Sequence, residues 1–328
     1  MDLPSEPKIR QRPSALDTQR PAAPAGEEWG LPASTSKRAE LDRRRRLATV
    51  VELLSEDSPS VLAVVRRELE SSGKAAFPAL ERAARAEDAR LRSRARDLLA
   101  FLRRKQVYRR LLRAAARPEL DLESGLFLLA SLDRPRFDAR PYRRALDAMA
   151  NEVGKRARSD SENFAHPMAL AHYLGNELGF VGGEEDFSHP DHIHLHRAIE
   201  LKRGMPLTLT AIYLFVARRT GLKAAPLALP GRVMLRLYLG RRSMIVDPFQ
   251  GGRARTRTDC LQYLASHGLV PRPEWFRNAT DEQLFQRHLM NLASSFQMRG
   301  LERDARELHA IARVMHRVHA QALEGTPT

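Results

Sequence analysis

Residues 201–222 read LKRGMPLTLTAIYLFVARRTGL, and the part between residues 207 and 217 is apolar on almost every side. Gly204 ends the preceding segment, Pro206 suits the first turn of a helix, and Gly221 stops it. A helix that is apolar all round belongs inside a domain, because none of its faces suits contact with water. The stretch therefore predicts a buried central helix around which the rest of the chain is arranged.

The next segment, APLALPGRVMLRLYLGRRSMIVDPF at residues 225–249, changes to a period of two. Its apolar residues Val233, Leu235 and Leu237 alternate with a second set, Arg232, Met234, Arg236 and Tyr238. Alternation of this kind is typical of a strand with one buried face, and Gly240 suits the turn to a returning strand that ends near Val246. We expect a small antiparallel sheet, and hence an α+β fold in which helix predominates.

Helical segments flank this core on both sides. Between residues 39 and 117, apolar residues recur at three- and four-residue spacing, which is typical of amphipathic helices. The stretch AAFPALERAARAEDARLRSRARDLL, residues 75–99, resembles a HEAT-like repeat. Residues 279–323 predict two helices broken at Gly300, an αα-hairpin of tetratricopeptide-like type.

These patterns divide the chain into five predicted parts. Residues 1–38 are rich in Pro, Ser, Ala and charge, so we expect a disordered tail. A HEAT-like segment at 39–117, a core domain at 118–278 and the helical hairpin at 279–323 follow. Residues 324–328 form a short second tail.

The formal net charge of +15 would suit an acidic partner such as nucleic acid. However, 48 of the 55 basic residues are arginine, a bias that a GC-rich genome produces by itself, and only 6% of residues are aromatic. The most basic helical region includes Arg90, Arg94, Arg103, Arg104 and Arg110. We interpret this basic face as a solvated helix surface, with a groove for an acidic ligand or for nucleic acid as the alternative.

The expected compartment is the cytoplasm. No window reaches the eighteen or so consecutive apolar residues that span a bilayer, and the first thirty residues lack the apolar stretch of a signal peptide. The single cysteine, Cys260, cannot form an internal disulfide, which fits a reducing compartment. We expect no membrane partner.

Four histidines crowd the stretch FSHPDHIHLHRAIE at residues 187–200, namely His189, His192, His194 and His196. If Asp191 caps a helix that runs to about Arg203, His192 and His196 share one exposed face and His194 points elsewhere. Imidazole is a common metal ligand, so Zn²⁺ or Ni²⁺ at His192 and His196 is the alternative. The preferred interpretation is a surface histidine cluster with no metal and no cofactor.

Taken together, several motifs resemble the SirB/YchA-type transglutaminase-like family, which belongs to the papain-like class. They are NELGF, RGMPLTLTAIYLFVARRTGL, LPGRVMLRL, VDPFQGG and HLMNLASSFQMRGLERDARELH, and they cover roughly residues 120–315. The resemblance implies a Cys/His/Asp triad in active members. Here the cysteine position holds Pro206 and the histidine position holds Arg232, so only Asp247 remains. Arginine stays protonated and cannot act as a general base.

The resemblance therefore implies a catalytically degenerate site. We expect Arg232 and Asp247 to lie on paired strands and to form a charge-assisted ion pair. This pair could be bidentate, with two parallel hydrogen bonds. Thr208 and Thr210 lie near the start of the buried helix but lack a neighbouring base, and Cys260 is most simply a small buried residue.

Three functions follow from these observations. The preferred one is a non-catalytic scaffold or regulatory module that binds a protein or peptide, because stacked helices and helical hairpins present surfaces of that kind. The second is a hydrolase or amide-transfer enzyme with a non-standard set such as Thr208, Arg232 and Asp247, or a metal-assisted site at His192 and His196. The third is a nucleic-acid-associated factor that uses the basic face.

Overall fold

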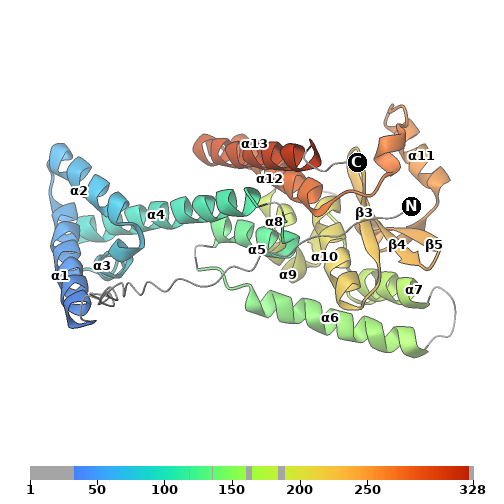
Figure 1. Ribbon diagram of the computed structural model, residues 1–328, viewed down its shortest axis with the longest axis horizontal. Helices are drawn as coiled ribbons and strands as arrows, with labels where there is room; N and C mark the ends of the chain where they lie inside the picture. The colour runs from blue at the N-terminus through green and yellow to red at the C-terminus, as the bar shows by residue number, and fades with distance from the viewer. Residues whose placement is uncertain (1–32, 118, 135, 160–164, 184–188, 325–328) are drawn as a thin grey trace, which may run out of the picture.

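The computed structural model describes residues 33–117, 119–134, 136–159, 165–183 and 189–324 (Figure 1). The predicted class is confirmed, since helices predominate and a small antiparallel sheet lies among them. Helix α1 begins at Ala33, so the predicted tail boundary at residue 38 lies inside a helix. Residues 1–32 and 325–328 lie outside the described residues.

The N-terminal helices form a separate small core. They are α1 (Ala33–Glu52), α2 (Pro59–Ser72), α3 (Phe77–Ala83) and α4 (Ala89–Ala115), with the 3₁₀ turns η1 (Leu53–Ser55) and η2 (Gly73–Ala76). Helix α4 begins where the Asp88 carboxylate accepts a hydrogen bond from the Leu91 amide at 2.7 Å. The apolar residues of α4 up to Leu102 pack into this first core, whereas those from Val107 onward enter the main core. The change of core therefore falls within α4.

The main core surrounds the predicted buried helix, α10 (Pro206–Arg219), in which every residue from Pro206 to Ala217 is buried. The elements that precede it are α5 (Leu122–Asp133), α6 (Arg140–Ser159), α7 (Ala165–His172), the π-helix η3 (Tyr173–Glu177), α8 (Pro190–Ile193) and α9 (Leu195–Leu201). Two short strands, β1 (Val181–Gly182) and β2 (Arg203–Gly204), pair in parallel just before it.

The sheet extends the predicted hairpin by one strand on each side. Its antiparallel order is β3 (Ala224–Leu229), β4 (Arg232–Leu239), β5 (Arg242–Asp247) and β6 (Arg253–Arg255). Val233, Leu235 and Leu237 of β4 join the core around α10, whereas Met234 packs on the other side with Cys260 of α11 (Arg257–Ser266). The period of two thus separates the two faces of β4, as expected. The 3₁₀ turns η4 (Pro248–Gln250) and η5 (Pro273–Phe276) complete this part.

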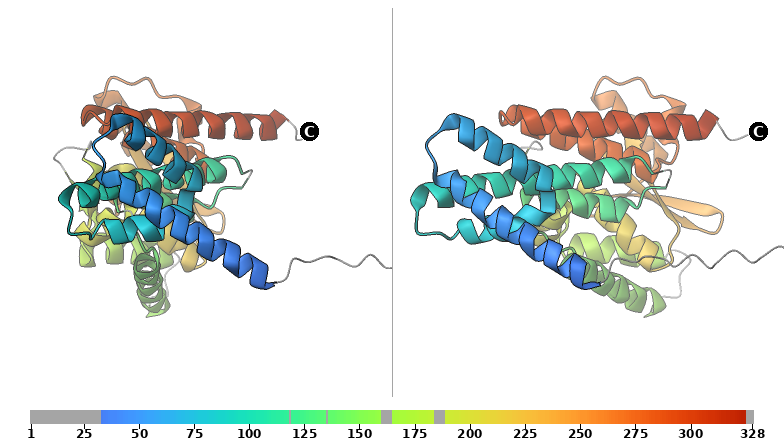
Figure 2. Two further views of the ribbon diagram at one scale, coloured as in Figure 1. Left: turned by 90° about the vertical axis from the view of Figure 1, so that its left-hand side faces the viewer. Right: turned by 60° about the vertical axis from the view of Figure 1, so that its left-hand side comes forward.

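The C-terminal hairpin consists of α12 (Asp281–Met298) and α13 (Glu302–Glu324), which meet at Gly300 as predicted. Its apolar face joins the main core, and α13 also lies alongside α4 (Figure 2). The hairpin therefore packs both on the main core and on α4. None of the described helices is long and apolar enough to cross a membrane.

Glycines allow the VDPFQGG turn to pack directly on η3 and β1. A methyl group on Gly175 would lie 1.8 Å from the carbonyl oxygen of Gly251, and one on Gly182 would lie 2.1 Å from Cε2 of Phe249. Distances this short leave no room for a side chain. The close approach fixes the end of β5, and with it Asp247, against the core.

We predict that Gly175→Ala lowers the free energy of unfolding by at least about 1–3 kcal/mol, because the added methyl group meets backbone and forces the turn away. Gly154→Ala is the matched control. Its methyl group would lie 3.7 Å from Nη1 of Arg158, an ordinary contact on α6, and we expect a gain of about 0.5–1 kcal/mol. Urea unfolding of both variants measures the difference, and equal stabilities would refute the packing argument.

Candidate functional site

Pro206, which the sequence comparison predicts at the nucleophile position, is the first residue of the buried helix. Pro206 is buried at the start of α10, after Met205, whose side chain makes no capping hydrogen bond. Proline is well suited to the first turn because it has no amide hydrogen to satisfy there. The same residue offers no group that could attack a carbonyl carbon.

Arg232 and Asp247 lie on the paired strands β4 and β5, as predicted, but the contact between them is looser than expected. Arg232 Nε lies 3.9 Å from Asp247 Oδ2, and Nε of Arg255 on β6 lies 3.8 Å from the same oxygen. Both distances exceed the hydrogen-bond range. The expected bidentate pair is therefore wrong, and two arginines share the carboxylate without donating to it.

The Asp247 side chain is only 1% exposed. Its Oδ1 accepts a hydrogen bond from the Phe249 amide at 3.1 Å, whereas Oδ2 has no hydrogen-bond partner among the described residues. Burial raises the pKa of Asp247 above its ordinary value, and the charges of Arg232 and Arg255 offset only part of this effect. Desolvation thus outweighs the ion pair.

Aromatic rings hold the Arg232 guanidinium in place over this carboxylate. Its carbon Cζ lies 4.5 Å from the ring centre of Phe249 and 5.5 Å from that of Tyr263. Contacts of this kind stabilise a guanidinium against an aromatic face. Arg232 is therefore a cation packed between two rings.

Other groups that could act as nucleophiles are engaged or buried. Thr208 donates a hydrogen bond to the carbonyl oxygen of Ile193 at 3.0 Å, and Thr210 donates to that of Val233 at 2.9 Å. Cys260 is fully buried, and burial raises the pKa of its thiol. These three side chains fasten α10 and α11 to their neighbours.

The histidine stretch departs from the predicted single helix. It breaks at His194, which has an extended backbone (φ −72°, ψ 125°) between α8 and α9. The N-cap of α8 is His189, whose Nδ1 accepts a hydrogen bond from the amide of Asp191 at 3.2 Å. The prediction that Asp191 caps one long helix is therefore wrong.

The break also separates the two proposed ligands. His192 belongs to α8 and is half-buried, whereas His196 belongs to α9 and is fully buried, so they share no exposed helix face. The rings of His194 and His196 instead lie side by side, 5.5 Å between their centres. Within the ranges that the structure describes, no group of three or more His, Cys, Asp or Glu side chains is arranged to hold a metal ion.

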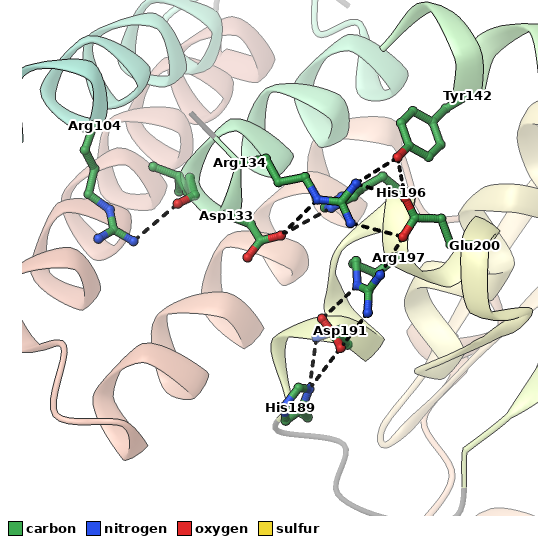
Figure 3. Close-up of polar contacts among 10 residues, drawn as sticks. Arg104, Asp133, Arg134, Tyr142, His189, Asp191, His196, Arg197 and Glu200 are labelled. Carbon is green, nitrogen blue, oxygen red and sulfur yellow. Dashed lines mark hydrogen bonds and ion pairs between the residues drawn. The ribbon is translucent and has the colours of Figure 1, made fainter. Parts of the chain in front are cut away.

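A polar network surrounds His196 at the ends of α5 and α9 (Figure 3). Nε2 of His196 lies 3.3 Å from Oδ2 of Asp133, although the geometry is not that of a hydrogen bond. Burial, followed by the charge of Arg134, lowers the pKa of His196 despite the Asp133 carboxylate. Hence His196 is neutral at neutral pH. The expectation of a solvated histidine cluster is wrong for His194 and His196 because both rings are buried.

Glu200 is the acceptor at the centre of this network. Arg134 donates to it from two nitrogens, at 2.9 and 3.1 Å, and Arg197 donates at 2.5 Å, while the Tyr142 hydroxyl makes a further short hydrogen bond. Burial would raise the pKa of Glu200, but these donors outweigh it and lower the pKa to about 2. The network fixes α9 on the N-terminal turn of α6.

One member of the buried histidine group was not predicted. His288 on α12 is fully buried, and burial, with a smaller contribution from the charge of His194, lowers its pKa to about 3. Its ring nitrogens have no hydrogen-bond partner among the described residues. In the sequence His288 is a lone histidine in an amphipathic helix, and only the fold brings it near the histidine stretch.

Most of the predicted basic face is paired within the chain. Arg90 donates to both oxygens of Asp57, Arg103 pairs with Glu81, and Arg94 donates to the carbonyl oxygens of Leu54 and Glu56. Arg104 pairs with Asp304 across the helices, and only Arg110 among the five lies exposed without a partner in the described part of the chain. The five arginines therefore do not form one continuous cationic surface.

We predict that Asp247→Asn costs less than the about 3–5 kcal/mol that breaking a hydrogen-bonded buried ion pair costs. Because the folded-state pKa lies above the ordinary 3.8, the natural chain has its full advantage over the variant below pH 3.8. It loses that advantage as the pH rises through the raised pKa. Urea unfolding between about pH 4 and about pH 8 measures this trend.

Asp147→Asn serves as the control, because Asp147 forms an exposed ion pair with Arg219 and its loss should cost no more than about 1 kcal/mol. An advantage of the natural chain that grows as the pH rises would mean that the ionised carboxylate is favoured in the fold. That result would contradict the loose pair.

Comparison with known proteins places the site within a recognised domain. Residues 140–290 match the family model described as Transglutaminase-like superfamily. The chain is similar to UPF0162 proteins from two strains of Xylella fastidiosa. It is 29% identical to that of strain 9a5c over 158 residues, which cover 46% of this chain and 55% of the relative. It is 30% identical to that of strain Temecula1 over 138 residues, which cover 41% and 48%.

The chain is also similar to F-box only protein 21 of Mus musculus, with 24% identity over 107 residues that cover 30% of this chain and 17% of that protein. The chain spans about half the length of the Xylella relatives. No solved structure gives a significant match. The transglutaminase-like resemblance is thus supported for residues 140–290, whereas the finer SirB/YchA-type assignment stays a prediction.

Proposed function

We propose that this chain is a non-catalytic transglutaminase-like protein of the SirB/YchA type that acts as a protein-interaction scaffold or regulatory module. The observation that carries the non-catalytic part is the position of Arg232. A permanently charged guanidinium lies where a base would be needed, packed on Phe249 and Tyr263 beside Asp247. Acyl transfer needs a nucleophile and a base within hydrogen-bond reach of each other, and Pro206 and Arg232 supply neither.

The hydroxyl groups that a non-standard enzyme could use give little support to the rival proposal. Both threonines at the start of α10 donate to backbone carbonyls, so activating either would break a buried hydrogen bond. The thiol of Cys260 packs at 3.9 Å from Sδ of Met234 in an apolar cluster. We therefore favour binding over catalysis.

A cavity of about 480 Å³ between α4 and α13 supports a binding role. Phe101, Leu112 and Ile311 supply apolar surface. The charged lining residues are Arg104, Lys105, Arg109 and Arg303, which outnumber Asp304 and Glu307. The Arg303 guanidinium lies over the Phe101 ring at 4.6 Å, which leaves its edge available to an acceptor. An apolar groove with cationic walls fits a peptide segment that carries apolar and acidic side chains.

The non-catalytic proposal predicts no turnover. The purified full chain, incubated with a fluorescent amine and a glutamine-containing protein, and separately with peptide amides, should give no more product than buffer. The natural thiol should resist alkylation until the chain is unfolded, because it is buried. Product formation that Cys260→Ala, Thr208→Val or Asp247→Asn abolishes in a folded variant would refute the proposal.

The scaffold proposal predicts peptide binding in the groove between α4 and α13. Selection of a displayed library of randomised peptides on the full chain should enrich sequences that combine apolar and acidic residues. Leu112→Glu should abolish their binding, since Leu112 is 41% exposed on the groove wall. Val270→Glu, at a site 80% exposed and outside the groove, is the control. No enrichment, or binding that survives Leu112→Glu, would contradict this part of the proposal.

A further inference from the structure

A second, smaller cavity of about 320 Å³ lies where four parts of the fold meet. Arg104 reaches it from α4, Ser131 and Asp133 from α5, His194 from the junction of α8 and α9, and Phe296 and Arg299 from the end of α12. Figure 3 shows Arg104 pointing toward the end of α5, where Asp133 lies. The size is within the range of sites for small molecules.

The Arg104 side chain is held rigidly at the wall of this cavity. Its Nε lies 3.2 Å from Oδ1 of Asp304, and its Nη2 donates to the carbonyl oxygen of Leu132 at 3.4 Å. Its guanidinium also lies over the Phe296 ring at 5.7 Å, and Tyr108 holds Asp304 with a hydrogen bond of 2.6 Å. A cation fixed in this way loses little conformational freedom when it binds an anion.

His194 gives the independent sign that the cavity takes a polar ligand. Only 3% of this residue is exposed, and no hydrogen bond joins its imidazole to any of the described residues. Because the ring lies on the cavity wall without a partner in the described part of the chain, it is free to bond to a ligand in the cavity. A neutral imidazole still offers one N–H donor.

The charges around the cavity favour an anion. Arg299 is cationic and exposed at the edge without an ion pair among the described residues, while Arg104 adds a guanidinium whose Nε lies beside Asp304. Asp133 is the one carboxylate among the lining residues, and it already lies 3.8 Å from Nε of Arg134 and 3.3 Å from Nε2 of His196. The Phe296 ring and other apolar lining atoms leave room for a compact apolar group.

We propose that this cavity binds a small organic anion, a carboxylate or phosphate monoester on a compact apolar body, with its charged head between Arg104, Arg299 and His194 and its apolar part against Phe296. The walls come from α4, α5, the α8–α9 junction and the C-terminal hairpin. A bound anion would therefore hold α4 against these parts of the core. The ligand would thus stiffen the arrangement that carries the groove between α4 and α13. This proposal does not depend on the absence of catalysis.

Calorimetry on the full chain tests the proposal with benzoate and phenyl phosphate as probes and benzyl alcohol as the uncharged counterpart. We expect saturable binding of at least one anion at concentrations up to about 10 mM and none of the alcohol. Stronger binding of benzoate or of phenyl phosphate identifies the head group as carboxylate or phosphate. Absence of binding by both anions would overturn the proposal.

Variants locate the binding. Arg299→Gln should weaken it about 10-fold, since a charge-assisted contact is lost from an exposed residue whose replacement leaves the fold intact. Arg306→Gln removes the same charge from an exposed position on α13 outside the cavity and should change nothing. His194→Phe should weaken binding without lowering the melting temperature, and Ser131→Ala is the substitute if that variant fails to fold. Anion binding that none of the cavity variants weakens, or that Arg306→Gln weakens equally, would place it elsewhere and refute the proposal.

Discussion

The burial of α10 on every side is the constraint on which the structure depends. Every residue of this helix from Pro206 to Ala217 is buried, because the sheet, α6, α9 and the C-terminal hairpin all pack around it. Helices that lack a polar face are stable only in such a position. The same packing excludes water from the end of the sheet that lies beside the helix. Asp247 is consequently held in an environment where its charge is costly, and neither of its two neighbouring arginines donates a hydrogen bond to it.

The sequence was most informative where one short segment determines its own structure. The apolar run of α10, the alternation along β4 and the break at Gly300 are local patterns, and the elements they predict are present. The histidine stretch was predicted less well. The prediction from the spacing of His192 and His196 assumed one continuous helix, but the helix is broken at His194. Arg255, His288 and the cavity between α4, α5 and α12 depend on contacts between distant segments. No spacing within the sequence encodes such contacts.

Helices on either side of the part that matches the transglutaminase-like model create two hollows on the surface. Helix α4 contributes to two cores, and α13 lies along it, so a groove and a cavity form on either side of Arg104. In the groove, Arg104 pairs with Asp304, and the same side chain lines the cavity. Binding in the cavity and binding in the groove would therefore act on the same side chain.

The most direct test of this account is the pKa of the Asp247 carboxyl, measured by carbon NMR of the selectively labelled full chain. Burial without a hydrogen bond from arginine predicts a pKa above the ordinary value of 3.8. A solvated, open site would leave the pKa at that value, and a tight ion pair with Arg232 would lower it. Either of those two results would contradict a closed site in which Arg232 and Arg255 lie beside a buried Asp247 without donating to it. A raised pKa would support it.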